Sequence, residues 1–207
     1  CFHIMNLKAT QLIIFIFHFA FQQTAFAQVS SWNWAQSDGG DSHERIESTA
    51  LLYNHIVISG SFYSDSVDFG QFSFVNSDST GNSSDAFVAE YDTDGKVVWS
   101  TKIGGPGMEN AQAIKTHLFG ETSVAGTFTS EELLVDTFHL KNMAGSISSY
   151  IVRYGNTKEV LWAKSFQDIL VSSITANDEN GDVVITGTFT VPQIKLGPTT
   201  LVNKGGT

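Results

Sequence analysis

An internal repeat constrains this chain more than any other feature of its sequence. Gly60, Gly126 and Gly187 are each followed by Ser or Thr and then by Phe, and successive copies lie 66 and 61 residues apart. Sixteen residues after each of these glycines the sequence has an asparagine: Asn76, Asn142 and Asn203. Repeats of this length are typical of propellers, solenoids and other arrays, in which each unit buries its apolar face against the next.

Each repeat is expected to form four strands. In the second repeat these strands are 111–117, 122–129, 149–154 and 159–166, which are short runs rich in Val, Ile, Phe and Thr. Several runs, such as 55–59, are apolar on both faces, as a sheet between two neighbouring sheets requires. The longer stretch 63–85 is expected to hold an extra short strand pair and a loop. These patterns predict an all-β fold, a β-propeller of four-stranded blades of about 63 residues each.

The repeats also predict how the chain is divided. Residues 44–103 form the first blade, 104–166 the second and 167–207 a partial third, so the chain is an incomplete fragment of about two and a half blades. Segment 28–43 contains Trp34, which matches Trp99 and Trp162 in the fourth strands of the later blades. This segment is therefore expected to be an N-terminal strand, and it is a candidate for closing the ring of a longer protein.

Residues 5–27 have the features of a secretory signal peptide. Lys8 supplies a positive start, residues 12–21 are apolar, and 25–27 form a small-residue cleavage site. The ten residues 12–21 are too few to span a bilayer, so no transmembrane segment is expected in the mature chain. Residues 1–4 precede the first methionine and are interpreted as an upstream translation artefact, which leaves a mature chain without cysteine. The expected location, after cleavage following Ala27, is secreted, extracellular or on the cell surface.

The net charge of −10 bears on the class of partner. A negative surface repels the phosphate backbone, so binding of nucleic acid is not expected. An acidic and well-solvated extracellular surface explains the charge without any special function.

Two acidic stretches are interpreted as tight turns, with calcium binding as the alternative. The first has Asp92 and Asp94 before Gly95. The second has four oxygen-bearing side chains: Asn177, Asp178, Asn180 and Asp182. An EF-hand calcium loop also needs a late bidentate glutamate, and neither stretch has one. A glycine that supplies positive φ is the ordinary signal of a hairpin turn.

Histidines and a glutamate pair are further candidates for chemistry. The expected mature chain has four histidines: His43, His55, His117 and His139. None has the spacing of paired metal ligands, and His55 and His117 stand near strand ends, where a solvated imidazole is expected and zinc is the alternative. Glu131 and Glu132 are interpreted as solvated loop charges rather than as half of a glycosidase pair. No catalytic, cofactor-binding or metal residue is assigned.

Tryptophan recurs once per repeat. Trp34, Trp99 and Trp162 share one position in the repeat, which favours packing between blades over a platform for stacking sugars. Trp32 is outside this register and is the candidate for an exposed aromatic side chain.

These motifs together resemble the bacterial SBBP repeats, a family of β-propeller repeats in secreted and cell-surface proteins. The first copy of the pattern comprises Trp34, Gly39, Gly40, Gly60, Phe62, Phe69, Gly70, Phe87, Val88, Tyr91, Gly95 and Trp99. Asp136 replaces the loop glycine in the second copy, and Phe166-Gln167 replaces the Gly-Gly pair in the third. The resemblance covers nearly all of 32–207. It implies an extracellular or surface location and no catalysis, and it supplies no ligand-binding residue.

These observations predict a secreted or cell-surface, non-enzymatic β-propeller that acts as a binding, adhesion or structural module. Its expected partner is an unknown extracellular protein or glycan, and no cofactor is expected. One alternative is an accessory propeller of a larger secreted hydrolase. A less favoured alternative is a propeller dehydrogenase with a quinone cofactor, whose repeats end in a motif like Gly95–Trp99, but the chain's one cysteine cannot form the cysteine pair often found in such sites.

Overall fold

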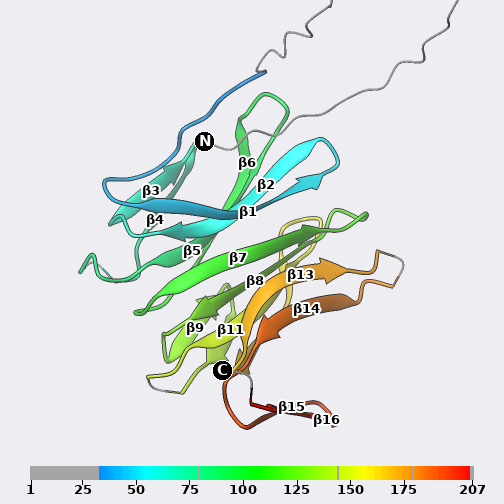
Figure 1. Ribbon diagram of the computed structural model, residues 1–207. Helices are drawn as coiled ribbons and strands as arrows, with labels where there is room; N and C mark the ends of the chain where they lie inside the picture. The colour runs from blue at the N-terminus through cyan, green and yellow to red at the C-terminus, as the bar shows by residue number, and fades with distance from the viewer. Residues whose placement is uncertain (1–32, 79, 144, 179, 206–207) are drawn as a thin grey trace, which may run out of the picture. The chain divides into compact units, whose positions relative to one another are not determined.

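The computed structural model describes residues 33–207, apart from 79, 144, 179, 206 and 207 (Figure 1). The predicted signal peptide, its cleavage site and Trp32 lie outside the described residues. Every helix or strand element in the described part is a β-strand, and neighbouring strands in the sheets run antiparallel. No helix in this part could span a membrane. The prediction of an all-β fold is confirmed.

The first repeat folds into a four-stranded sheet with a small hairpin attached. The strands are β1 (Glu44–Leu52), β2 (His55–Phe62), β5 (Asp85–Tyr91) and β6 (Val97–Ile103), in the spatial order β1-β2-β5-β6. The hairpin consists of β3 (Ser66–Phe69) and β4 (Phe72–Val75). It lies within the long connection between β2 and β5, where the sequence predicts an extra strand pair.

The second repeat has the same organisation. Its strands are β7 (Glu109–Thr116), β8 (Thr122–Phe128), β11 (Ser148–Tyr154) and β12 (Val160–Gln167), and its hairpin is β9 (Glu132–Val135) with β10 (Phe138–Lys141). The four strands of the sheet lie at the predicted positions, and their ends differ from the prediction by at most two residues.

The third repeat contributes two strand pairs. These are β13 (Leu170–Ala176) with β14 (Val183–Thr188), and β15 (Gln193–Leu196) with β16 (Thr199–Val202). They correspond to the first two strands and the hairpin of the earlier repeats. The described part of the chain is thus a propeller-like fragment of repeated small sheets.

The glycine that anchors each repeat lies opposite a bulge in the first strand. In all three repeats the register between the first and second strands shifts at this point. A Cβ atom on Gly60 would lie 1.8 Å from the carbonyl oxygen of Arg45, and one on Gly126 would lie 1.8 Å from that of Asn110. At Gly187 the corresponding distance is 2.3 Å. Because no side chain fits at these distances, the bulge requires glycine.

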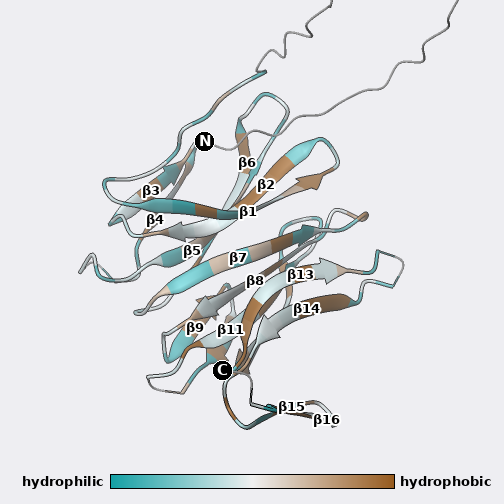
Figure 2. Cartoon of the chain, in the orientation of Figure 1, coloured by the Kyte–Doolittle hydropathy of each residue, from teal (hydrophilic) through white to brown (hydrophobic). Residues whose placement is uncertain are grey.

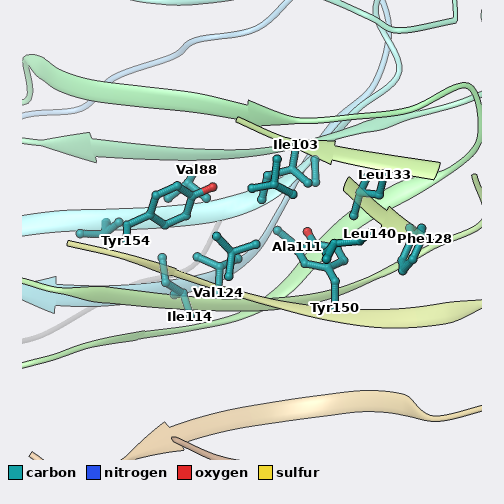
Figure 3. Packing of buried hydrophobic residues seen from close by; sticks show 14 of the residues in the cluster. Val88, Ile103, Ala111, Ile114, Val124, Phe128, Leu133, Leu140, Tyr150 and Tyr154 are labelled. Carbon is teal, nitrogen blue, oxygen red and sulfur yellow. The ribbon is translucent and has the colours of Figure 1, made fainter. Parts of the chain in front are cut away.

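Apolar side chains are buried in three clusters. The largest lies between the first two sheets and includes Val88, Ile103 and Val124 (Figure 3). The second covers the opposite face of the first sheet, where the β3–β4 hairpin brings Phe69 against Phe87. The third joins the second sheet to β13, β14 and β15. Burial on both faces explains why a strand such as β5 is apolar along most of its length.

Segment 28–43 differs from the prediction where it is described. Residues 33–38 form no strand, and Gly39 makes only an isolated bridge. The later fourth strands each pair with a third strand of their own sheet, and no such strand lies beside Trp34 in the described residues. Trp34 nevertheless stacks on Tyr91 with ring centroids 6.2 Å apart, as Trp99 contacts Tyr154 at 5.2 Å. Closing a ring remains a prediction for this segment.

Candidate functional site

Unusual side chains gather at both ends of the sheets. At one end, short turns connect the first strand to the second and the third to the fourth. We call these turns the turn surface, which comprises 53–54, 92–96, 117–121, 155–159 and the described residues of 177–182 (Figure 1). At the other end lie the Gly-Gly pairs and the buried polar side chains that bind them, which we call the Gly-Gly network.

The Gly-Gly network is built on a buried carboxylate. Glu109, at the start of β7, is completely buried. Its carboxylate accepts hydrogen bonds from the hydroxyl of Ser130 at 2.7 Å and from the backbone amide of Gly105 at 2.8 Å. The hydroxyl of Ser130 in turn accepts a hydrogen bond from the amide of Gly107 at 2.7 Å. These bonds close the turn after β6 onto the first strand of the second sheet.

The electrostatics of this network resemble those of a catalytic acid. The pKa of Glu109 is raised to about 7, mainly by burial; the hydrogen bond from Ser130 opposes this rise and the nearby Asp85 carboxylate adds to it. Asp85 is also completely buried, and it accepts a hydrogen bond from Ser77 and pairs with the ammonium of Lys102 at 2.8 Å. A carboxyl group with a raised pKa is a common feature of general acids, so the network is a candidate for chemistry.

The same network occurs in the first repeat and is replaced in the third. In the first repeat, the Ser64 hydroxyl donates to the Glu44 carboxylate and accepts the amide of Ser42 at 2.7 Å. In the third repeat, the strand register places Ile169 and Val191 at the positions of the glutamate and the serine. Both belong to, or pack against, the third apolar cluster. The glutamate–serine pair of the first two repeats is thus replaced by an isoleucine–valine pair in the third.

The glycine pair changes together with these side chains. Strand pairing aligns Phe166 of β12 with Ile103 of β6. Gln167 and Asp168 therefore stand where 104–105 stand in the second copy, and the predicted replacement by Phe166-Gln167 is wrong by one residue. Because the carboxylate, the hydroxyl and the glycine pair occur together or not at all, the network is best explained as a structural unit of the repeat.

The turn surface joins turns from all three repeats. The hydroxyl of Tyr53, between β1 and β2, donates to the carbonyl oxygen of Leu118, between β7 and β8, at 2.7 Å. The guanidinium of Arg153 in β11 donates to the carbonyl oxygen of Gly181, between β13 and β14, at 2.5 Å. These contacts hold the turns of successive repeats beside one another.

Tyr53 has an unfavourable backbone conformation. It is the first residue of a two-residue turn and has a φ of 56°, where glycine is the favoured residue. In the described residues of the corresponding turns, Gly120 and Gly181 have the positive φ values, 87° and 73°. Tyr53 is 71% exposed, so burial of its ring does not offset a conformational cost of roughly 1–2 kcal/mol.

Large apolar side chains are exposed beside Tyr53. Leu118 and Phe119 in the β7–β8 turn are 64% and 72% exposed, and Leu51 at the end of β1 is 70% exposed. Figure 2 shows the hydrophobic colouring at the tip of the β7–β8 turn. We call Leu51, Tyr53, Leu118 and Phe119 the anchor patch. Contiguous exposed apolar side chains are a common feature of interaction surfaces.

The two acidic stretches are both turns with internal hydrogen bonds. The Asp92 carboxylate accepts the amides of Asp94 at 3.0 Å and Lys96 at 2.9 Å. In the other stretch, the side-chain oxygen of Asn180 accepts the amide of Asp182 at 3.0 Å. Among the residues that the structure describes, no three His, Cys, Asp or Glu side chains are grouped so that they could hold a metal ion.

His117 differs from the predicted solvated imidazole. It is only 4% exposed, and its Nε2 lies 2.9 Å from the hydroxyl oxygen of Ser123. Burial lowers its pKa, and the charge of Arg153 lowers it further. His55 is half-buried, with its Nδ1 2.6 Å from the Glu90 carboxylate. Both imidazoles are therefore packed at the base of the turns, because the neighbouring sheet covers these strand ends.

The remaining candidates lie away from the turn surface. His139 and Glu132 face each other across the β9–β10 hairpin at 3.2 Å, and both are largely exposed. Glu131 is exposed, and its carbonyl oxygen accepts the amide of Asn142 at 2.9 Å. The carbonyl oxygen of His43 accepts a hydrogen bond from the amide of Tyr63, just after β2. Apart from the His139–Glu132 contact, the structure does not bring these residues together.

Trp99 and Trp162 pack between neighbouring sheets, as their spacing predicts, whereas Trp34 packs on the outer face of the first sheet. Trp99, Trp34 and Trp162 pack against the first, second and third apolar clusters, respectively. The ammonium of Lys158 lies 5.2 Å from the ring centre of Trp99, which fixes the edge of the turn surface to the core.

Sequence reasoning missed Tyr53 and Glu109. The signal for Tyr53 is a two-residue gap between strand runs that contains no glycine. The signal for Glu109 is its distance from the preceding glycine pair, since Glu44 and Glu109 both stand four residues after the second glycine. Each signal depends on comparing copies of the repeat turn by turn.

Comparisons with known proteins agree with a repeat protein of this architecture. No protein-family model matches the chain. A region of 111 residues, 50% of this chain, is 28% identical to part of an uncharacterized WD repeat-containing protein of Acanthamoeba polyphaga mimivirus. The match spans 8% of that protein's length. WD repeats are built as propeller blades, so the similarity supports a propeller-type binding or scaffold module. The narrower resemblance to SBBP repeats remains a prediction.

Proposed function

We propose that this chain is part of a secreted or cell-surface β-propeller that binds an extracellular protein or glycan through the turn surface, without catalysis. The conformation of Tyr53 is the observation that carries this proposal. Its ring is exposed and its backbone is strained, in a turn where the other repeats have glycine. Strain of this kind is typical of ligand-contacting positions, and binding residues are commonly presented on turns by a rigid scaffold.

The Gly-Gly network supports the non-enzymatic part of the proposal. The raised pKa of Glu109 follows from burial in a unit that is also built around Glu44. A pair of structural carboxylates at equivalent positions accounts for these groups without a reaction. The WD repeat-containing relative is likewise consistent with a binding or scaffold role.

Binding is tested by applying the full-length protein to arrays of extracellular proteins and glycans. The proposal predicts saturable binding to at least one of them, and it predicts that Tyr53→Gly weakens this binding while the unfolding temperature changes little. Val75→Ser is the matched control, since Val75 is exposed on β4, away from the turn surface. Turnover of an arrayed glycan, or binding that is indifferent to Tyr53→Gly, would contradict the proposal.

Export is tested separately with residues 1–43 fused to an alkaline phosphatase that is active only outside the cytoplasm. The fusion should be active outside the cell membrane and should be cleaved after Ala27. Phe15→Asp interrupts the apolar run at 12–21 and should abolish export. An inactive fusion that keeps its leader would argue against secretion and leave the binding role to be tested inside the cell.

A further inference from the structure

We infer that the turn surface binds a basic polypeptide segment in which an apolar or aromatic side chain lies between lysines or arginines. This inference rests on the binding function proposed above and adds the chemistry of the partner. The anchor patch supplies the apolar contact, and the turns around it supply negative charge.

The aromatic part of the anchor patch is held in place before binding. The Tyr53 hydroxyl is fixed by its hydrogen bond to Leu118, and the neighbouring turn packs closely around it. A Cβ atom on Gly120 would lie 3.1 Å from the Cβ of Asn156 and 3.8 Å from the Tyr53 hydroxyl oxygen. A fixed, exposed tyrosine loses little conformational entropy on binding, which is why this residue is enriched at binding hot spots.

Two cations at or beneath the turn surface, Lys158 and Arg153, are already paired within the protein. Lys158 pairs with Glu90, which is 4% exposed and also contacts His55. Arg153 pairs with Glu121 between the second and third repeats. These ion pairs neutralise positive charge that would otherwise attract an acidic partner.

The exposed charges at the tips of the turns are mainly negative in the described residues. Asp94, Glu159 and Asp182 are exposed on three different turns, and Lys96 is the exposed cation among them. The chain as a whole has a net charge of −10, so the long-range field has the same sign. A basic partner is therefore attracted to this end of the sheets, whereas an acidic glycan or a nucleic acid is repelled.

The combination of features selects a polypeptide over a sugar. A neutral sugar would stack on Tyr53 or Phe119 but would gain nothing from the surrounding carboxylates. A peptide with an apolar side chain between basic residues satisfies both the exposed apolar patch and its acidic rim. Apolar anchors surrounded by charged contacts are the usual anatomy of a protein–protein contact.

The test uses the full-length protein and two synthetic peptides of equal length. One has the sequence Lys-Arg-Leu-Trp-Arg-Lys, and in the other each basic residue is replaced by Asp or Glu. Binding of fluorescent forms is followed by anisotropy at about 50 and about 300 mM NaCl, between which the electrostatic screening length falls from about 14 to about 6 Å. The basic peptide should saturate the protein and bind more weakly at high salt, and the acidic peptide should not bind.

Variants test the apolar contact and the charged contact separately. Tyr53→Gly should weaken binding of the basic peptide roughly tenfold or more, and Tyr53→Phe should weaken it much less because the ring is kept. Asp94→Asn and Asp182→Asn should each weaken binding by roughly two- to fivefold at low salt. Val75→Ser should leave binding unchanged.

Equal binding of both peptides, or binding of the basic peptide that is unaffected by Tyr53→Gly, overturns the inference. If neither peptide binds, but Tyr53→Gly weakens binding to an arrayed glycan or acidic protein, the partner class is wrong and the proposed function stands. If Tyr53→Gly weakens binding to no probe at all, the inference and the proposed function are both wrong.

Discussion

The Gly-Gly network and the turn surface lie at opposite ends of the same sheets, and each contains side chains in unusual places. The network buries the carboxylates of Glu109 and Asp85, whereas the turn surface exposes an anchor patch that includes Tyr53 and Phe119. Charged side chains are rarely buried and large apolar groups are rarely clustered on a surface. Either region, taken alone, would be identified as a functional site.

Repetition separates the two regions. The Glu–Ser–Gly-Gly arrangement is present in two copies and is exchanged as a unit in the third, so it serves folding. Tyr53 has a positive φ in a turn whose longer counterparts use glycine for it, so it departs from the repeat at a cost. Lys158 also has a positive φ, but its ammonium pairs with Glu90, whereas the ring of Tyr53 is 71% exposed. In an array, features that recur stabilise the unit, and a costly feature found in one copy is the better guide to binding.

The largest expected effect comes from the glycine at the bulge. Gly126→Ala places a Cβ atom where the carbonyl oxygen of Asn110 lies, and we expect it to lower the free energy of unfolding by more than about 4 kcal/mol. Thr127→Ala, at the half-buried neighbouring position, is the control and should cost less than about 1 kcal/mol. Equal stability of the two variants in urea unfolding would mean that the bulge does not define the repeat.

The stability of the protein should fall as the pH rises through the pKa of Glu109. Because the folded pKa of about 7 is above the unfolded value near 4.5, the folded state binds more protons between these values. The resulting stability is fully present below about pH 4.5 and lost as the pH rises through about 7, by up to roughly 3 kcal/mol. Urea unfolding from pH 5 to 8 measures it, and Glu109→Gln should flatten the profile. A variant profile parallel to that of the natural protein would contradict this assignment.

The third repeat provides a template for exchanging the network. Ser130→Val removes a hydrogen-bond donor from buried Glu109 and should cost about 2 kcal/mol of unfolding free energy. The double variant Glu109→Ile with Ser130→Val copies Ile169 and Val191, and it should recover about 1–2 kcal/mol relative to the sum of the single changes. Strictly additive losses would show that the carboxylate and the hydroxyl do not act as a pair.

The smallest expected effect on stability is at Tyr53. Tyr53→Gly relieves a backbone cost of roughly 1–2 kcal/mol and loses one exposed hydrogen bond worth about 1 kcal/mol, so thermal unfolding should change little. Tyr53→Ala keeps the strain and should be less stable than Tyr53→Gly. Marked destabilisation by Tyr53→Gly would assign the ring a structural role and weaken the contrast between the two regions.

Much of the fold could be predicted because the same pattern of strand runs and turn residues occurs in each repeat. The strand positions follow from alternation and turn signals, and Trp99 and Trp162 correctly indicate packing between sheets. The reason that Gly60 recurs is not visible in the sequence, since it depends on a carbonyl oxygen brought across from β1. The strand predicted at Trp34 is not formed, because strand pairing depends on a neighbour as well as on the segment itself.

The candidate site was less predictable for physical reasons. The burial of His117 depends on a neighbouring repeat that covers the strand end, and local polarity does not report it. Glu109 reads as an ordinary charged residue until the sheets enclose it. Tyr53 belongs to no motif, and its significance lies in a backbone angle that propensity assigns to glycine.

The central claim is that Tyr53 serves binding and the Gly-Gly network serves folding. Measuring the unfolding free energy and the affinity for the basic peptide on the same samples of Tyr53→Gly and Ser130→Val tests it most directly. We predict that Tyr53→Gly loses affinity and keeps stability, whereas Ser130→Val loses stability and, at temperatures where it is folded, keeps affinity. Loss of affinity in the folded Ser130→Val variant, with normal binding by Tyr53→Gly, would contradict the account.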